Sequence, residues 1–216
     1  GEYLHNCREL AEVTLWRKKW GYGINGVTYG THSLGPILSW FKGDRVTKVM
    51  CAGSGHHYTD SKGELYVQED TCIMLAKTEK GRLIKIRQDI SSNRPYNLKY
   101  ILQGTQGCYD SARYKEERDL VWIEGLCQEE KWISLNELED KYLPEIWQKY
   151  GQVAQKEGHD GSDFIIMTDY LDALINNRPV PISIHESLDM TLPGLISQES
   201  IKQGGIWLDV PNSREW

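Results

Sequence analysis

Residues 67–89, VQEDTCIMLAKTEKGRLIKIRQD, decide the fold of this chain. Two runs rich in strand-forming residues, at 67–77 and 82–89, stand on either side of the tripeptide Glu79-Lys80-Gly81. A short connection that ends in glycine is typical of a hairpin turn, because glycine adopts the backbone angles that the turn requires. The two runs are therefore predicted to form neighbouring antiparallel strands.

Further short β-type runs continue on both sides of this hairpin. They lie at residues 46–52, 98–103, 107–113 and 120–123, with a second predicted turn at 104–107. Residues 91–96 (SSNRPY) have no periodicity and are predicted to form a loop at a sheet end. Successive strands without helices between them predict an α+β fold with a mostly antiparallel sheet.

Helical spacing of apolar residues flanks the β-rich region at 31–43, 134–150, 163–176 and 185–203. Thr31 is expected to cap the first helix, Pro144 to weaken the second and Pro193 to kink or break the last. Short strands are predicted at residues 1–5 and 206–210, the first as if cut from a longer chain. No repeat or linker divides the sequence, which predicts a single domain over residues 1–216.

The composition narrows the range of partners and compartments. A formal net charge of -6 over 216 residues gives no basic stripe for nucleic acid. No apolar run approaches the roughly 20 residues that span a bilayer, so a membrane partner is not expected either. Five widely spaced cysteines without a CxxC pair favour reduced thiols and a cytoplasmic setting over zinc or a redox centre. Eight Trp and 12 Tyr suit stacking on sugar rings, although they also fill cores and oligomer interfaces.

His32 is the titratable group with the most suggestive position. It opens the first predicted helix after a glycine-rich loop and stands three residues after Tyr29. A helix N-terminus favours the neutral imidazole, which can accept a proton, and Tyr29 can donate or relay one. The alternative is a histidine that only hydrogen-bonds backbone at the start of a helix.

Two further pairs could contact a substrate. Arg94 and Tyr96 lie on the predicted loop at a strand end, where they could hydrogen-bond to a sugar and stack on it; an Arg94 ion pair with a nearby carboxylate is the alternative. His159 and Asp163 stand at the start of the third predicted helix, where a sugar hydroxyl could be held. Helix capping without further function is the alternative for this second pair.

Other familiar chemistry finds little support. His56 and His57, with Asp60 nearby, could suggest a metal site, but adjacent residues on a strand point to opposite sides, which favours a surface loop. The sequence has no G-x-G-x-x-G fingerprint for a dinucleotide and no G-x-S-x-G nucleophile elbow. The chain by itself is therefore not expected to bind a nicotinamide cofactor.

Four stretches, in order along the chain, resemble the Gfo/Idh/MocA family, and within it the NAD-dependent α-N-acetylgalactosaminidase-like glycosidases. Their family patterns are Y-P-T-H-x-L-G-P, H-D-V-T-S-P-R-P-Y, G-T-K-G and G-H-G-G-x-D-F. The matching residues here are 29–37 (YGTHSLGPI), 88–96 (QDISSNRPY), 104–107 (GTQG) and 158–164 (GHDGSDF). The chain departs from the patterns at Gly30, where the family often has Pro, and at Asp160, which replaces a Gly and adds a charge beside His159.

The resemblance implies an open, mostly antiparallel sheet with helices packed on one face and a homo-oligomer formed through the other. It also implies a substrate-side domain whose NAD or NADP is held by an N-terminal Rossmann domain upstream of Gly1. No cofactor is expected to bind this chain alone.

For the reaction, the resemblance implies a sugar or glycoside substrate, with His32 and Tyr29 as acid/base residues and Arg94, Tyr96, His159 and Asp163 as substrate neighbours. The whole enzyme would be a sugar dehydrogenase or a glycosidase-like enzyme, and the isolated chain would be inactive. The rival interpretation is a non-catalytic carbohydrate-binding or oligomerisation module.

Overall fold

The computed structural model describes residues 2–4 and 8–216 and is built on a six-stranded sheet with the order β10-β2-β3-β4-β1-β5. β1 pairs in parallel with β4, and the other strand pairs of this sheet are antiparallel among the described residues. The mostly antiparallel sheet predicted from the sequence is therefore confirmed. Residues 1 and 5 of the predicted first strand lie outside the described residues. The strands are Glu2–Leu4 (β1), Val46–Gly53 (β2), Thr71–Thr78 (β3), Leu83–Asp89 (β4), Asn97–Lys99 (β5) and Leu208–Asp209 (β10).

The hairpin of β3 and β4 has the predicted turn. The backbone N–H of Thr78 donates to the carbonyl of Arg82 at 2.9 Å, and Gly81 has a φ of 81°, which a side chain would disfavour. The first strand begins at Thr71 and not at residue 67, because the N–H groups of Gln68 and Asp70 donate to loop carbonyls outside the sheet. Residues 67–70 are therefore held as loop.

A second sheet of four antiparallel strands has the order β6-β7-β8-β9. The run predicted at 98–103 is divided between the two sheets at Tyr100, whose backbone N–H donates to the Ser111 hydroxyl and whose carbonyl accepts from the Ser111 N–H. The Gly104 N–H donates to the Gly107 carbonyl at 2.9 Å, which confirms the second predicted turn. The strands are Ile101–Gln103 (β6), Gly107–Asp110 (β7), Leu120–Ile123 (β8) and Ile133–Ser134 (β9).

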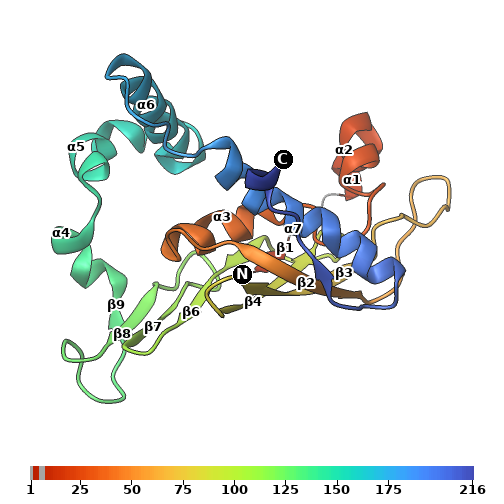
Figure 1. Ribbon diagram of the computed structural model, residues 1–216, viewed down its shortest axis with the longest axis horizontal. Coiled ribbons are helices and arrows are strands. Elements are labelled where there is room, and N and C mark those ends of the chain that lie inside the picture. The colour runs from red at the N-terminus through yellow and green to blue at the C-terminus, as the bar shows by residue number, and fades with distance from the viewer. Residues whose placement is uncertain (1, 5–7) are drawn as a thin grey trace.

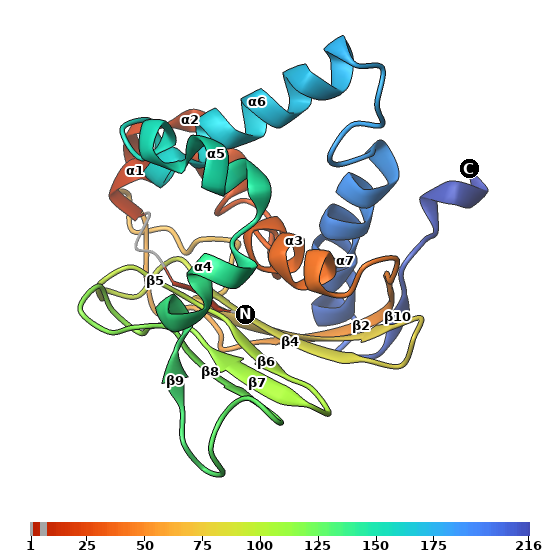
Figure 2. The same ribbon diagram turned by 90° about the vertical axis from the view of Figure 1, so that its left-hand side faces the viewer.

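Helices lie over one face of the main sheet, as expected, with α3 and α7 directly across it (Figure 1). α5 and α6 form an arm that extends past the main sheet (Figure 1), on the same side as α3 and α7 (Figure 2). In the described part of the chain, no helix is long and apolar enough to cross a bilayer. The α-helices are Arg8–Val13 (α1), Leu15–Trp20 (α2), Thr31–Trp40 (α3), Glu139–Tyr142 (α4), Glu145–Ala154 (α5), Ser162–Ile175 (α6) and Ile184–Lys202 (α7); 3-10 turns are Leu135–Leu138 (η1), His159–Gly161 (η2) and Ser213–Glu215 (η3).

Several helix boundaries differ from the predictions. Thr31 is the first helical residue and not the cap, because Gly30 takes the cap position and makes no side-chain cap bond. The helix predicted at 134–150 is three pieces, since Ser134 ends β9 and Pro144 separates α4 from α5. Pro193 does not break α7, which runs through it.

The core between α3, α7 and the sheet is filled by side chains from all three. Alternation along β3 buries Cys72, Met74 and Ala76 against the helices and leaves Ile73 on the opposite face. Where α7 crosses the loop before α3, the backbones nearly touch: a Cβ at Gly194 would lie 2.5 Å from the Val27 carbonyl oxygen. This contact fixes the loop that enters α3.

Candidate functional site

The loop at residues 26–30 places Tyr29 through backbone hydrogen bonds. The Val27 N–H donates to the buried Ser197 hydroxyl on α7 at 2.8 Å, and the Tyr29 N–H donates to Oε1 of Gln88, a buried residue on β4, at 2.8 Å. The Gly30 N–H donates to the Val27 carbonyl at 3.2 Å, and Gly30 has a φ of -63°, the angle that a proline would impose. Glycine in place of the family's proline at position 30 therefore leaves the backbone angle φ unchanged.

Tyr29 and His32 form a stacked pair at the start of α3. Their ring centroids are 4.4 Å apart and their planes differ by 21°. The hydroxyl of Tyr100 donates to the His32 backbone carbonyl, so a residue from between the two sheets borders the pair. The structure thus brings together the two residues predicted to do acid/base work.

The pKa values of the two predicted site histidines move in opposite directions. Partial desolvation lowers the pKa of His32 from its ordinary 6.5, and the positive charge of nearby His159 adds to that effect. The hydrogen bond and charge of Asp163 raise the pKa of His159, with a smaller contribution from Asp160. At neutral pH the His32 imidazole is therefore neutral and able to accept a proton.

Tyr96 belongs to the same neighbourhood. Burial raises the pKa of Tyr96, and electrostatic interaction with Tyr29 adds to the shift, so the two phenols lie close enough to influence each other. Burial and Tyr96 together raise the pKa of Tyr100 to about 12. Tyr96 and Tyr100 therefore remain neutral hydrogen-bonding groups over the physiological range.

Arg94 is held by a buried carboxylate. Its guanidinium pairs with Asp89, whose side chain also accepts bonds from Thr71 and from Ser92. Burial raises the pKa of Asp89, but these hydrogen bonds and the Arg94 charge outweigh it, so the net shift is downward. The ion pair that the sequence left open is present. A substrate contact by Arg94 stays a prediction.

His159 and Asp163 meet where η2, between α5 and α6, leads into α6. The His159 Nδ1 lies 2.9 Å from the Asp163 carboxylate, and both side chains are exposed. His159, Asp160 and Gly161 all have positive φ, at 52°, 55° and 91°. Asp160 thus occupies a left-handed position at which the family pattern has glycine.

The neighbourhood also includes aromatic residues that were not predicted from the sequence. A cavity of about 180 Å³ lies beside Tyr29 and is lined by Trp16, Arg17 and Trp20 of α2. The signal in the sequence was the charged, Trp-bearing stretch LWRKKW, which had no predicted neighbour in space. Tyr100 was missed because its partner, the His32 carbonyl, is a backbone atom.

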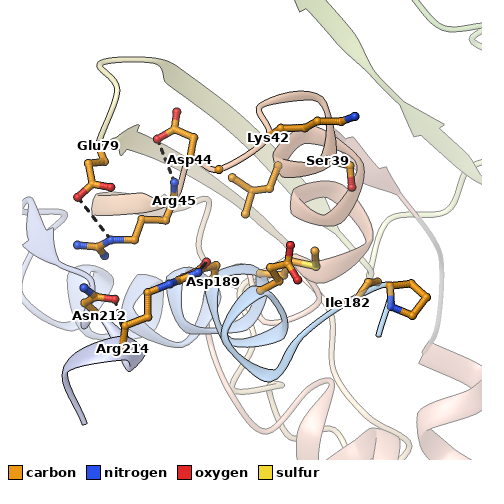
Figure 3. A pocket seen from close by; sticks show the side chains of 14 residues that line it. Ser39, Lys42, Asp44, Arg45, Glu79, Ile182, Asp189, Asn212 and Arg214 are labelled. Carbon is orange, nitrogen blue, oxygen red and sulfur yellow. Dashed lines mark hydrogen bonds and ion pairs between the residues drawn. The ribbon is translucent and has the colours of Figure 1, made fainter. Parts of the chain in front are cut away.

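A larger pocket of about 610 Å³ lies at the other end of α3 and contains none of the predicted site residues (Figure 3). Its charged groups largely neutralise each other, since Arg214 pairs with Asp189 at 2.9 Å and Arg45 lies 3.9 Å from Glu79. With three basic and four acidic side chains in its lining, the pocket carries little net charge to attract a ligand.

The side chains that could have suggested a metal site form hydrogen bonds and ion pairs within the protein. His57 Nδ1 lies 2.6 Å from Asp70, and Asp60 pairs with Lys18 at 2.8 Å. Among residues 2–4 and 8–216, no group of three His, Cys, Asp or Glu side chains could hold a metal ion. Cys51, Cys72, Cys108 and Cys127 are free thiols, whereas Cys7 lies outside the described residues.

Solved structures with the same fold define the class. A levoglucosan dehydrogenase in complex with NADH and levoglucosan aligns over 98% of this chain and 57% of its own, with a TM-score of 0.66 and 15% identity. An inositol dehydrogenase homologue from Azotobacter vinelandii, in complex with NADH and myo-inositol, aligns over 96% and 55%, with a TM-score of 0.57 and 16% identity. The fold is that of the C-terminal domain of Gfo/Idh/MocA oxidoreductases.

The family model "Glycosyl hydrolase 109, C-terminal domain" matches residues 5–215, so the chain belongs to this family. A glycosyl hydrolase family 109 protein of Saccharopolyspora erythraea is 28% identical over 98% of this chain and 49% of its own length. An α-N-acetylgalactosaminidase of Tannerella forsythia is 26% identical over 91% and 44%. The chain therefore spans about half the length of the curated relatives it matches.

Proposed function

We propose that this chain, as a single domain, forms the sugar-binding side of the active site of an NAD(P)-dependent enzyme, with Tyr29 and His32 as its acid/base residues. The observation that carries the proposal is the stacked pair at the start of α3, in which the His32 pKa is lowered. A neutral imidazole beside a phenol can accept a proton from a substrate and return it, as general acid/base catalysis requires.

The described residues do not fit a dinucleotide by themselves. The main sheet is mostly antiparallel, and the chain lacks the glycine-rich strand-to-helix turn that holds a pyrophosphate. We therefore assign the nicotinamide to a Rossmann domain in the other half of the protein, where it would supply reversible hydride removal from a sugar carbon. On this proposal the isolated chain neither binds the cofactor nor turns over.

With the cofactor held by the other half of the protein, His32 would take the proton from the substrate and Tyr29 would donate or relay one. Tyr96, Arg94, His159 and Asp163 would position the sugar from the loop after β4 and from the start of α6. The exposed His159–Asp163 pair offers a charged donor for a ring hydroxyl.

The name of the Tannerella forsythia relative favours the glycosidase-like outcome, with an α-N-acetylgalactosaminide as substrate. The test is to incubate the full-length protein with NAD and panels of aryl glycosides and free sugars, following aglycone release and NADH absorbance. NAD-dependent release without net NADH supports the glycosidase-like cycle, and net NADH from a free sugar supports a dehydrogenase. Silence in both channels contradicts the proposal.

A second candidate function is self-association. Ile73 and Leu83 lie on the sheet face that the helices leave open and are 44% and 65% exposed. Exposed apolar side chains on adjacent strands are typical of a protein contact surface. We propose that the protein forms a homo-oligomer through this open face.

We also propose that the protein acts in the cytoplasm, where its widely spaced cysteines stay reduced.

A further inference from the structure

We infer that the cavity between α2 and Tyr29 is a subsite for a second pyranose ring, the unit to which the reacting sugar is linked. This inference rests on the proposed function, since Tyr29 forms one wall of the cavity and is assigned there to the reaction. A ring bound in this cavity would therefore adjoin the bond at which Tyr29 acts.

The walls of the cavity are rings with apolar faces. Trp16 and Trp20 of α2 line it, and buried Tyr22 and Ile90 also contribute. The two indoles remain about half exposed, at 51% and 56%, so they present surface that the described residues of this chain do not cover. Large aromatic surface of this kind is where a ligand gains most from burial.

The site is held in place before any ligand binds. Lys18 of α2 pairs with Asp60 at 2.8 Å, which anchors this short helix to the loop before β3. On the cavity floor the Tyr22 hydroxyl donates to the Ile90 carbonyl at 2.5 Å, and the Gln68 N–H donates to the Tyr22 carbonyl at 2.9 Å. A preorganised cavity costs less ordering when a ligand enters.

The chemistry of the lining suits a sugar ring better than an alkyl chain. A pyranose has C–H faces and a rim of hydroxyl groups, so it needs apolar surfaces with hydrogen-bond donors at their edge. The Arg17 guanidinium stacks at 4.6 Å from the Trp16 ring centroid and also lines the cavity, which places planar donors beside the indole. Two indoles and one guanidinium supply both requirements.

The test uses the full-length protein with NAD and two α-N-acetylgalactosaminides, one with a pyranose leaving group and one with a methyl leaving group. Trp16→Ala and Trp20→Ala should each lower kcat/KM for the disaccharide roughly 3- to 10-fold, the loss of one ring contact, and leave the methyl glycoside unchanged. Trp132→Ala, an exposed tryptophan outside the cavity lining, is the matched control. Equal losses on both substrates, or no loss on either, would overturn the subsite.

A binding measurement separates this inference from the proposed reaction. If neither glycoside is turned over, calorimetry with the same disaccharide and with free N-acetylgalactosamine decides. Weaker disaccharide binding in Trp16→Ala and Trp20→Ala, with monosaccharide binding unchanged, would keep the subsite although the reaction fails. Identical disaccharide affinity in wild type and both variants would remove the subsite alone.

Discussion

The ring of Tyr29 stacks on the ring of His32 across the first turn of α3, with their centroids 4.4 Å apart. The backbone of Tyr29 is tied to Gln88 on β4, whereas His32 belongs to the helix itself. The pair therefore joins the sheet to the helix at one point. Two rings held in this way need no movement of either element to stay aligned.

Removing either functional group should abolish most turnover while leaving the fold intact. Tyr29→Phe keeps the ring and its stacking but removes the hydroxyl, and His32→Asn removes the base. Each variant of the full-length protein is expected to lose about 10²- to 10⁴-fold in kcat, the usual contribution of one acid or base. Thermal unfolding serves as the control. A His32→Asn protein with near-wild-type kcat would contradict the assignment.

The two site histidines should titrate on opposite sides of their ordinary pKa of 6.5, with His32 below it and His159 above it. His159→Gln removes the neighbouring positive charge and should raise the His32 pKa toward 6.5. Asp163→Asn should lower the His159 pKa, because its main stabilising partner is lost. NMR titration of the ring protons measures both. Because the proposed function assigns neutral His32 as the base, His159→Gln should also move the acidic limb of the activity profile to higher pH.

Asp89 is a buried carboxylate whose replacement should be costly. Its side chain is 2% exposed and pairs with Arg94, so Asp89→Asn leaves a partly buried guanidinium without its partner charge. We expect a loss of about 3 kcal/mol in the free energy of unfolding, measured with urea. Asp209→Asn, which removes an exposed pair with Lys48, should lose less than about 0.5 kcal/mol.

The pH dependence of that loss follows from the sign of the Asp89 shift. A lowered pKa means that the folded state favours the carboxylate, so the stabilisation is fully present above the unfolded value of 3.8. It is lost as the pH falls through the folded pKa, below 3.8. The gap between wild type and Asp89→Asn should therefore narrow below pH 3.8, and a constant gap would contradict this account.

Asp160→Gly should change stability little, within about 0.5 kcal/mol. Relief of the left-handed strain at φ 55° is offset by the greater freedom of glycine in the unfolded chain. Gln152→Gly, at an exposed helical position of α5, should instead lose about 1 kcal/mol. Urea unfolding compares the two, and equal losses would show that Asp160 is not strained.

Leu83→Lys should weaken self-association through the open sheet face. A lysine there must be desolvated in an apolar contact, which favours the monomer. Sedimentation velocity at several concentrations measures the effect, and Leu195→Lys on α7, on the helix-covered side, is the control. Unchanged sedimentation of Leu83→Lys would place any oligomer contact elsewhere.

The sequence predicted those parts of the fold that depend on local patterns. The β3–β4 turn at residues 79–81, the amphipathic α6 and the α3 position of His32 all follow from glycine placement and apolar spacing. The division of residues 98–103 between two sheets could not be predicted, because it depends on Ser111 bonding to both sides of the Tyr100 backbone.

For the candidate site, the motif order along the chain predicted Tyr29, His32 and His159; the structure stacks the first two, and partial desolvation together with the charge of His159 lowers the His32 pKa. The position of Trp16 and Trp20 beside Tyr29 could not be predicted from the sequence. It depends on the placement of α2, which a long-range ion pair between Lys18 and Asp60 holds. Such a pair leaves no periodic signal in a single sequence.

The close approach of Gly194 to the Val27 carbonyl links the position of α7 to the position of Tyr29, two residues further along the loop. With no side chain between the two backbones, there is nothing compressible to absorb a tilt of the helix. The orientation of α7 is therefore transmitted directly to the loop that ends at Tyr29. We therefore expect substitutions that tilt α7 to change the orientation of the Tyr29 side chain before they change the stability of the fold.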